Sequence, residues 1–239
     1  MNSNAKEERM SILAIIPARG GSKRIPKKNI KEFCGKPIIT YSIDAALTAN
    51  IFTEVMVSTD DEAIADIASK AGAKVPFMRG KEASSDFATT ADVLLEVLMM
   101  YEQQGIIFDE VCCIYPTAPF VTGEKLKKGY ELLKEGDSVM PVVKYSYPIQ
   151  RSIHIKDNLV YMNCPEYVNT RSQDLEDMYH DCGQFYFLKV EALKKTKALF
   201  TSQTVPMVMS DLEVQDIDHI EDWEIAEMKY KLFQKNLPM

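Results

Sequence analysis

Short apolar runs alternate with longer amphipathic segments over roughly the first 140 residues of the chain. The runs have the length of buried strands, and the longer segments repeat their apolar residues with a helical period. Strands are expected at 12–16, 54–57 and 111–115, and helices at 38–49, 61–71, 91–103 and 123–134. Regular alternation of this kind is typical of an α/β domain whose mainly parallel sheet is buried on both faces. We therefore predict a doubly wound α/β fold.

The alternation breaks after a further expected strand at 138–144. Residues 145–175 contain two prolines, the turn-forming pair Asp157-Asn158 and little helical period. We interpret this segment as an irregular, β-rich arm that leaves the main fold.

The last part of the chain returns to regular patterning. Strands are expected at 184–188 and 204–209, and an amphipathic closing helix at 220–234. No internal repeat, low-complexity tract or Gly/Ser-rich linker divides the chain. We therefore expect a single domain over residues 1–239.

The charge balance excludes some classes of partner. The chain has 28 Lys+Arg against 35 Asp+Glu, a formal net charge of -7. Nucleic acids and anionic membranes favour a surplus of positive charge, so neither is an expected partner. No apolar run approaches the roughly 18 residues that a membrane span needs. Met1 to Met10 is polar and lacks the features of a secretory signal, so we expect a cytoplasmic protein.

A basic, glycine-containing loop follows the first expected strand. Between Arg19 and Lys36 there are seven Lys or Arg residues and one acid. Ligands of α/β folds bind at the carboxyl ends of the strands, where this loop begins. Gly20 and Gly21 permit a tight turn with backbone N–H groups open to phosphate oxygens, while Arg19, Lys23 and Lys28 supply charge for a triphosphate. The loop matches neither GxxxxGK[ST] nor GxGxxG, and the alternative is a solvated basic loop.

An acidic region lies late in the chain. Residues 198–228 contain eight Asp and Glu and neither Lys nor Arg. In an extended segment Asp216 and Asp218 share one face, because side chains alternate with period two. Two carboxylates on one face suit Mg²⁺, a hard cation that also bridges to phosphate. The alternative is a solvated acidic turn that leads into the closing helix.

The loop Pro17 to Asn29 resembles the PARGGSKRIPxKN hallmark of the cytidylyltransferases that activate eight- and nine-carbon ulosonic acids, a family that includes the CMP-sialic acid synthetases. The resemblance extends over nearly the whole chain, with further similar segments at 57–61, 79–90, 115–119, 171–183 and 216–218. Within the family, the segments at 112–115, 148–151, 171–175 and 179–181 are most similar to the branch that acts on pseudaminic acid. The resemblance implies a Rossmann-like fold of the nucleotide-diphospho-sugar transferase type, with the arm as a dimerisation element.

The resemblance also implies an activity and a nucleotide site. CTP and a nonulosonic acid, pseudaminic acid first, would give the CMP-sugar and pyrophosphate, with Mg²⁺ held by Asp216 and Asp218. Arg19, Lys23 and Asp218 would be the catalytic residues. The residues implied to bind CTP are Ala18, Arg19, Gly20, Gly21, Ser22, Lys23, Lys28, Asn29, Arg79, Ala88 and Thr90. For the last three, which precede a helix, helix capping is an alternative role.

The sugar side is implied with less detail. Arg171 has the planar fork that matches a carboxylate, and the amides of Gln150, Gln173 and Gln184 and the ring of His180 would meet hydroxyl or acetamido groups. Tyr115 stands where many sialic acid synthetases have glutamine, which favours another nonulosonic acid. Alternative substrates are N-acetylneuraminic, legionaminic or another ulosonic acid. A more distant alternative is a nucleotide-binding module without catalysis.

Overall fold

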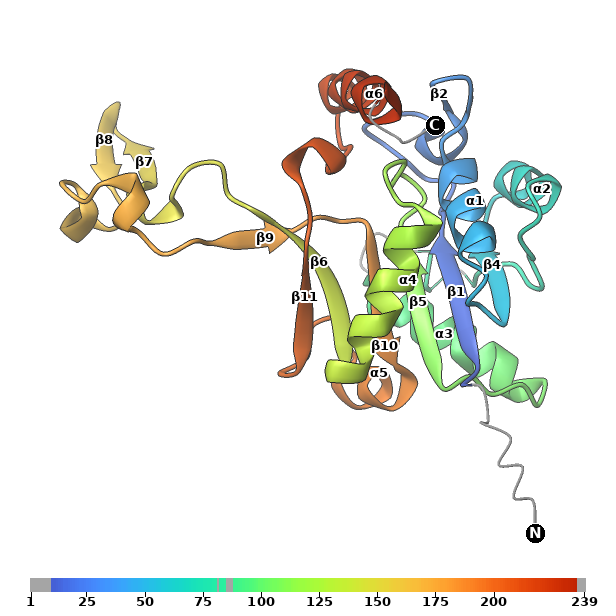
Figure 1. The fold of residues 1–239 in the computed structure, drawn as a ribbon. Coiled ribbons are helices and arrows are strands. Elements are labelled where there is room, and N and C mark those ends of the chain that lie inside the picture. Colours follow the sequence, from blue (N-terminus) through green and yellow to red (C-terminus); the bar gives the residue numbers. More distant parts are fainter. Residues whose placement is uncertain (1–9, 81, 85–87, 236–239) are drawn as a thin grey trace, which may run out of the picture.

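The computed structural model describes residues 10–80, 82–84 and 88–235. Its centre is a sheet with the strand order β11-β6-β10-β5-β1-β4, to which β9 adds a short pairing with β6. The strands are β1 (Ile12–Pro17), β4 (Glu54–Ser58), β5 (Glu110–Ile114), β6 (Ser138–Lys144), β9 (Tyr179–Asp181), β10 (Phe185–Lys189) and β11 (Thr204–Val208). Figure 1 shows helices on both sides of this sheet.

Side chains of the central strands alternate between two cores. Leu13 and Ile15 of β1 enter one apolar cluster, whereas Ala14 and Ile16 enter the other, and all four are buried. A strand with apolar residues at every position has apolar side chains on both faces of the sheet, so a layer of helices must cover each face. The expected doubly wound arrangement follows from this pattern.

The helices divide between the two faces. α1 (Ile39–Ala49), α2 (Glu62–Lys70) and α4 (Gly123–Leu132) contribute most of their buried apolar residues to one cluster. α3 (Thr90–Gln103) and α5 (Val190–Thr196) pack on the other face. The closing helix α6 (Ile220–Lys235) packs instead on the short hairpin of β2 (Glu32–Phe33) and β3 (Lys36–Pro37), where Phe33 and Trp223 meet edge to face.

The sheet is mixed, with a parallel core. β1 runs parallel to β4 and β5, and β11 runs parallel to β6. β10 is antiparallel to both of its neighbours, β5 and β6. The prediction of a Rossmann-like α/β fold with a mainly parallel sheet is confirmed. The prediction of one domain over 1–239 includes residues beyond those described at both ends and stays a prediction.

An arm leaves the sheet between β6 and β9 and projects away from the body of the molecule (Figure 1). It carries a hairpin of β7 (Ile153–Lys156) and β8 (Leu159–Met162). Asp157 and Asn158 form its turn with positive φ angles of 51° and 61°, the conformation of the type I′ turns that match strand twist. Among the described residues, no helix is long and apolar enough to cross a membrane.

Candidate active site

A cavity of about 590 Å³ opens at the carboxyl ends of β1 and β5. This size is within the range of small-molecule sites, and its place agrees with the rule for open α/β sheets. The glycine loop, the start of α3, the turn after β5 and the segment before α6 all contribute to its wall. The lining residues are Pro17, Arg19, Ser22, Lys23, Arg24, Ile25, Lys28, Asn29, Arg79, Ala83, Ala88, Thr89, Thr90, Val93, Tyr115, Pro116, Thr117 and Asp218.

Backbone hydrogen bonds fix the glycine loop to the end of β4. The N–H of Ala18 donates to the carbonyl of Ser58 (2.9 Å), so Ala18 is buried and continues the line of β1. The N–H of Gly20 donates to Oδ1 of Asp60 (2.9 Å). The side chain of Asn29 donates to the carbonyl of Arg19 (2.9 Å) and is buried. The loop therefore has a defined shape, and the Gly20 N–H that we expected to face phosphate is engaged by Asp60.

The two adjacent glycines differ in what surrounds them. A Cβ on Gly20 would lie 2.7 Å from Oδ2 and 2.9 Å from Cβ of Asp61, whereas a Cβ on Gly21 would meet no described atom within 4 Å. Asp61 is itself fixed, because its Oδ1 caps α2 by accepting from the N–H groups of Ala63 and Ile64. Gly20 therefore permits a close approach to α2, and Gly21 borders open space.

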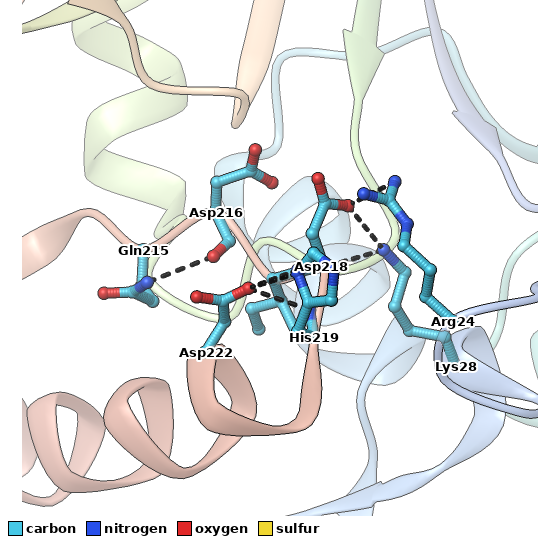
Figure 2. A network of polar contacts seen from close by, with 8 residues as sticks. Arg24, Lys28, Gln215, Asp216, Asp218, His219 and Asp222 are labelled. Carbon is cyan, nitrogen blue, oxygen red and sulfur yellow. Dashed lines mark hydrogen bonds and ion pairs between the residues drawn. The ribbon is translucent and has the colours of Figure 1, made fainter. Parts of the chain in front are cut away.

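Positive side chains from the loop meet the late acidic segment (Figure 2). Nη2 of Arg24 lies 2.8 Å from Oδ1 of Asp218, and Nζ of Lys28 lies 3.7 Å from the same oxygen. Lys28 also donates to the carbonyl of Ile217 (2.6 Å). Burial lowers the pKa of Lys28, while the charge of Asp218 opposes that shift. The first strand's loop and the segment before α6 thus form one charged site.

The predicted metal ligands flank a buried residue. Ile217 is fully buried, and the carboxylates of Asp216 and Asp218 both point away from α6 in Figure 2. Burial raises the pKa of the Asp216 carboxyl, and the neighbouring charge of Asp218 raises it further. A bound cation would offset the cost of ionising a half-buried carboxylate beside a second negative charge. This donor set fits Mg²⁺, which typically takes one or two protein carboxylates and completes its shell with phosphate and water.

The beginning of α6 holds this segment in place. Oδ2 of Asp222 accepts from the N–H groups of Asp218 (3.0 Å) and His219 (2.8 Å). These bonds lower the pKa of Asp222. Glu221 and Asp222 are thus first-turn acids of the helix, as expected from the helix dipole. In the described part of the chain, no group of three or more His, Cys, Asp or Glu side chains is arranged around a metal position.

The third wall of the cavity is the start of α3. Thr89 and Asp92 form a capping box, so the capping role expected for this segment is present. Oγ1 of Thr90 lies 3.1 Å from the phenol oxygen of Tyr115. Arg79 is buried and donates from Nε to Oγ of Ser58 (3.0 Å) and from Nη2 to the Ser58 carbonyl. Arg79, Ala88 and Thr90 therefore line the cavity, although residues 81 and 85–87 between them lie outside the described part.

A tyrosine pair connects this wall with the end of the arm. The rings of Tyr115 and Tyr186 meet at 5.5 Å, edge to face. Tyr186 donates to the carboxylate of Asp181 (2.8 and 2.7 Å), which also accepts from the N–H of Gly183 (2.8 Å). Burial raises the pKa of Tyr115 to about 12, so its phenol keeps its proton at neutral pH and can donate into the cavity.

The five predicted sugar-binding residues are dispersed. Gln150, Arg171 and Gln173 lie on the arm, where Gln150 donates to the Glu176 carbonyl (2.9 Å) and Arg171 pairs with Asp174 (2.7 Å). His180 is exposed on β9, and its ring lies 4.7 Å from that of Tyr145. Gln184 is buried and donates to the Glu213 carbonyl (2.6 Å). The structure does not bring these side chains together within one chain, and their sugar-binding role stays a prediction.

Several cavity residues were not among the predicted ones. The apolar residues Ile25 and Val93 line it, as do Tyr115, Pro116 and Thr117. One signal was available for the last three: they lie at the end of an expected strand or directly after it, and parallel strands end at one edge of a sheet. For Ile25 and Val93 an apolar side chain gives no such signal.

These features place the chain among the nucleotidyltransferases. The family model described as cytidylyltransferase matches residues 13–234, and the chain belongs to the cytidylyltransferase family. It is 43% identical over 226 residues to the pseudaminic acid cytidylyltransferase of Campylobacter jejuni, covering 93% of this chain and 97% of the relative. It is 35% identical over 238 residues to the CMP-N,N'-diacetyllegionaminic acid synthase of Legionella pneumophila, covering 95% of this chain and 100% of the relative.

A solved structure shows the same fold. The structure of CMP:2-keto-3-deoxy-manno-octonic acid synthetase complexed with CTP aligns with a TM-score of 0.66 and 16% identity, covering 94% of this chain and 99% of that one. The family resemblance inferred from the loop Pro17 to Asn29 is thereby confirmed.

Proposed function

We propose that the chain transfers CMP from CTP to the anomeric hydroxyl of pseudaminic acid and releases pyrophosphate. The observation that carries the proposal is the meeting of the basic glycine loop with Asp218 in one cavity, on a chain 43% identical to a pseudaminic acid cytidylyltransferase. A triphosphate needs concentrated positive charge, and phosphoryl transfer needs little from a protein beyond positioning and neutralisation.

The residues of the cavity have distinct roles in this reaction. Arg19 and Lys23 neutralise the triphosphate and the departing pyrophosphate. Lys28, which the Ile217 carbonyl and Asp218 hold in place, faces the α-phosphate. The anomeric oxygen forms a bond to the α-phosphorus in line with the bond that breaks to the β-phosphate, and the hydroxyl proton leaves to solvent. Mg²⁺ bound by Asp216 and Asp218 would neutralise phosphate charge and polarise the phosphoryl oxygens.

The base and the sugar would occupy different ends of the cavity. Arg79, Ala88 and Thr90 would surround cytosine, where donors and acceptors fixed by the fold select against uracil. The phenol of Tyr115 contacts Thr90 on this wall, and we assign it to the sugar. The preference for pseudaminic acid over legionaminic or N-acetylneuraminic acid rests on the similarity to the Campylobacter relative. We also place the protein in the cytoplasm, where CTP is made.

The arm supports a homodimer. Tyr147, Ile153, Ile155, Leu159 and Val160 expose between 56% and 85% of their surface. A two-stranded hairpin is marginally stable alone, and this one has apolar residues on both faces. A second copy would cover them, and it would also bring Gln150, Arg171 and Gln173 of one copy toward the nucleotide cavity of the other.

Product analysis tests the proposed function. The purified chain is incubated with CTP, Mg²⁺ and pseudaminic acid, and pyrophosphate release is measured together with the mass of the nucleotide product. We expect one CMP-sugar for each pyrophosphate and no release when the sugar acid is omitted. Binding of CTP without sugar-dependent pyrophosphate release would instead support a nucleotide-binding module.

A further inference from the structure

One ion pair spans the mouth of the cavity. Arg24 and Asp218 both line it, and their side chains are 58% and 36% exposed. The guanidinium of Arg24 pairs with Oδ1 of Asp218, one of the two carboxylates that we assign to the cation (Figure 2). A divalent cation on either oxygen of Asp218 would lie close to this guanidinium, and the two positive groups would repel each other.

The two positive side chains on Asp218 are not equivalent. Lys28 is anchored by the Ile217 carbonyl at 2.6 Å, and its side chain is 20% exposed. Arg24 is mainly exposed. Among the described residues, it pairs with the carboxylate of Asp218. Arg24 can therefore move away from Asp218 at low cost, whereas Lys28 cannot.

We propose that Arg24 and the divalent cation occupy Asp218 in alternation, and that Arg24, once displaced, binds the polyphosphate of the incoming nucleotide. This inference rests on the proposed function. Arg19, Lys23 and Lys28 line the same cavity, so a displaced Arg24 adds to a region that already repels cations and attracts a polyphosphate. A guanidinium forms bidentate bonds with phosphate oxygens as readily as with a carboxylate. Without nucleotide, Arg24 pairs with Asp218 and competes with the cation. With nucleotide bound, Arg24 binds the polyphosphate and the cation binds Asp218.

If Arg24 and the cation exchange on Asp218, removal of the Arg24 charge should raise the affinity for the cation and lower the affinity for the nucleotide. In the free protein, Arg24→Gln removes a competitor for Asp218, so the variant should bind the cation more tightly. The same variant lacks one charged donor for the polyphosphate, so it should bind CTP more weakly. A residue with a merely structural role would weaken both.

The experiment measures both affinities on the full chain. Mn²⁺ alone is titrated, with the free ion followed by electron paramagnetic resonance, and CTP with excess Mg²⁺ is titrated by calorimetry. We expect Arg24→Gln to bind Mn²⁺ about two- to fivefold more tightly, the range for an exposed ion pair, and CTP about tenfold more weakly. Arg24→Lys, which keeps the charge, should remain near the wild type for Mn²⁺.

Lys27→Gln is the matched control. Lys27 lies in the same loop, is exposed and loses the same charge on substitution. If Lys27→Gln tightens Mn²⁺ binding as much as Arg24→Gln, the effect is general electrostatics and the exchange is wrong. Unchanged or weaker Mn²⁺ binding by Arg24→Gln would also overturn it, and thermal melting checks that each variant is folded. Absence of pyrophosphate release by the wild type with every sugar would contradict the proposed function, while the Mn²⁺ comparison would still decide the exchange.

Discussion

Adjacent glycines in the loop provide a sharp test, because the same substitution should have different consequences at each. In Gly20→Ala the new Cβ would lie 2.7 Å from Oδ2 and 2.9 Å from Cβ of Asp61. Carbon contacts are favourable near 3.5–4.0 Å, so the loop must shift away from α2. The second of these atoms belongs to the stem of a capping side chain and cannot rotate away. Gly20 would also lose its 2.9 Å bond to Asp60.

The expected loss for Gly20→Ala is about 1–3 kcal/mol of unfolding free energy, the range for an overpacked site. For a chain of this size that corresponds to a melting temperature lower by roughly 2–10 °C. Gly21→Ala meets no described atom within 4 Å and has no left-handed backbone angle, so we expect its stability to be unchanged or higher by about 0.5 kcal/mol.

Affinity for CTP should separate the glycines again. If phosphate oxygens approach the backbone at Gly21, a methyl group there fills space that the nucleotide needs, and CTP binding should weaken about tenfold in a fully folded variant. Thermal melting and calorimetric titration with CTP measure the two effects. Equal melting temperatures for both variants would refute the close approach at Gly20, and normal CTP affinity in Gly21→Ala would refute the phosphate contact.

Three further predictions concern catalysis, the core and the arm. Asp218→Asn and Lys23→Ala should each reduce the rate of pyrophosphate release by orders of magnitude with an unchanged melting temperature, and near-normal turnover in either would remove the mechanism. Burial raises the pKa of Glu110 above its ordinary value of 4.5, although a hydrogen bond from Tyr130 opposes the shift. Ionising Glu110 in the folded state is therefore costly. The unfolding free energy of the wild type should fall as the pH rises from about 4.5, the value for the unfolded chain, through the raised pKa of the folded protein. The unfolding free energy of Glu110→Gln relative to the wild type should therefore increase between about pH 4 and pH 7, as measured by urea unfolding. An equal difference at both pH values would contradict this. Light scattering at micromolar concentration should give the mass of a dimer, whereas a monomeric mass would refute the role of the arm.

Much of the fold was predictable because apolar runs report burial directly. The expected strands and helices up to residue 144 correspond to elements of the structure with small shifts at their ends. The direction of β10 was not predictable, since a strand buried on both faces has the same pattern whichever way it runs. The short helix α5 was missed because its seven residues are too few to show a helical period.

The sequence indicated the separate segments of the site more clearly than the contacts between them. The loop Pro17 to Asn29 and the pair Asp216 and Asp218 were each recognisable from local composition. The contact between Lys28 and Ile217, which are 189 positions apart, depends on how α6 packs over the β2–β3 hairpin. The engagement of Gly20 by Asp60 could not be predicted either, because it depends on the distance between the ends of β1 and β4.

The central claim is that this chain activates pseudaminic acid with CTP. The most direct measurement is the rate of pyrophosphate release with CTP and Mg²⁺ on pseudaminic, legionaminic and N-acetylneuraminic acids, each at several concentrations. We predict a kcat/KM for pseudaminic acid well above that for the other two acids. Negligible release with pseudaminic acid beside fast turnover of another acid would contradict the claim.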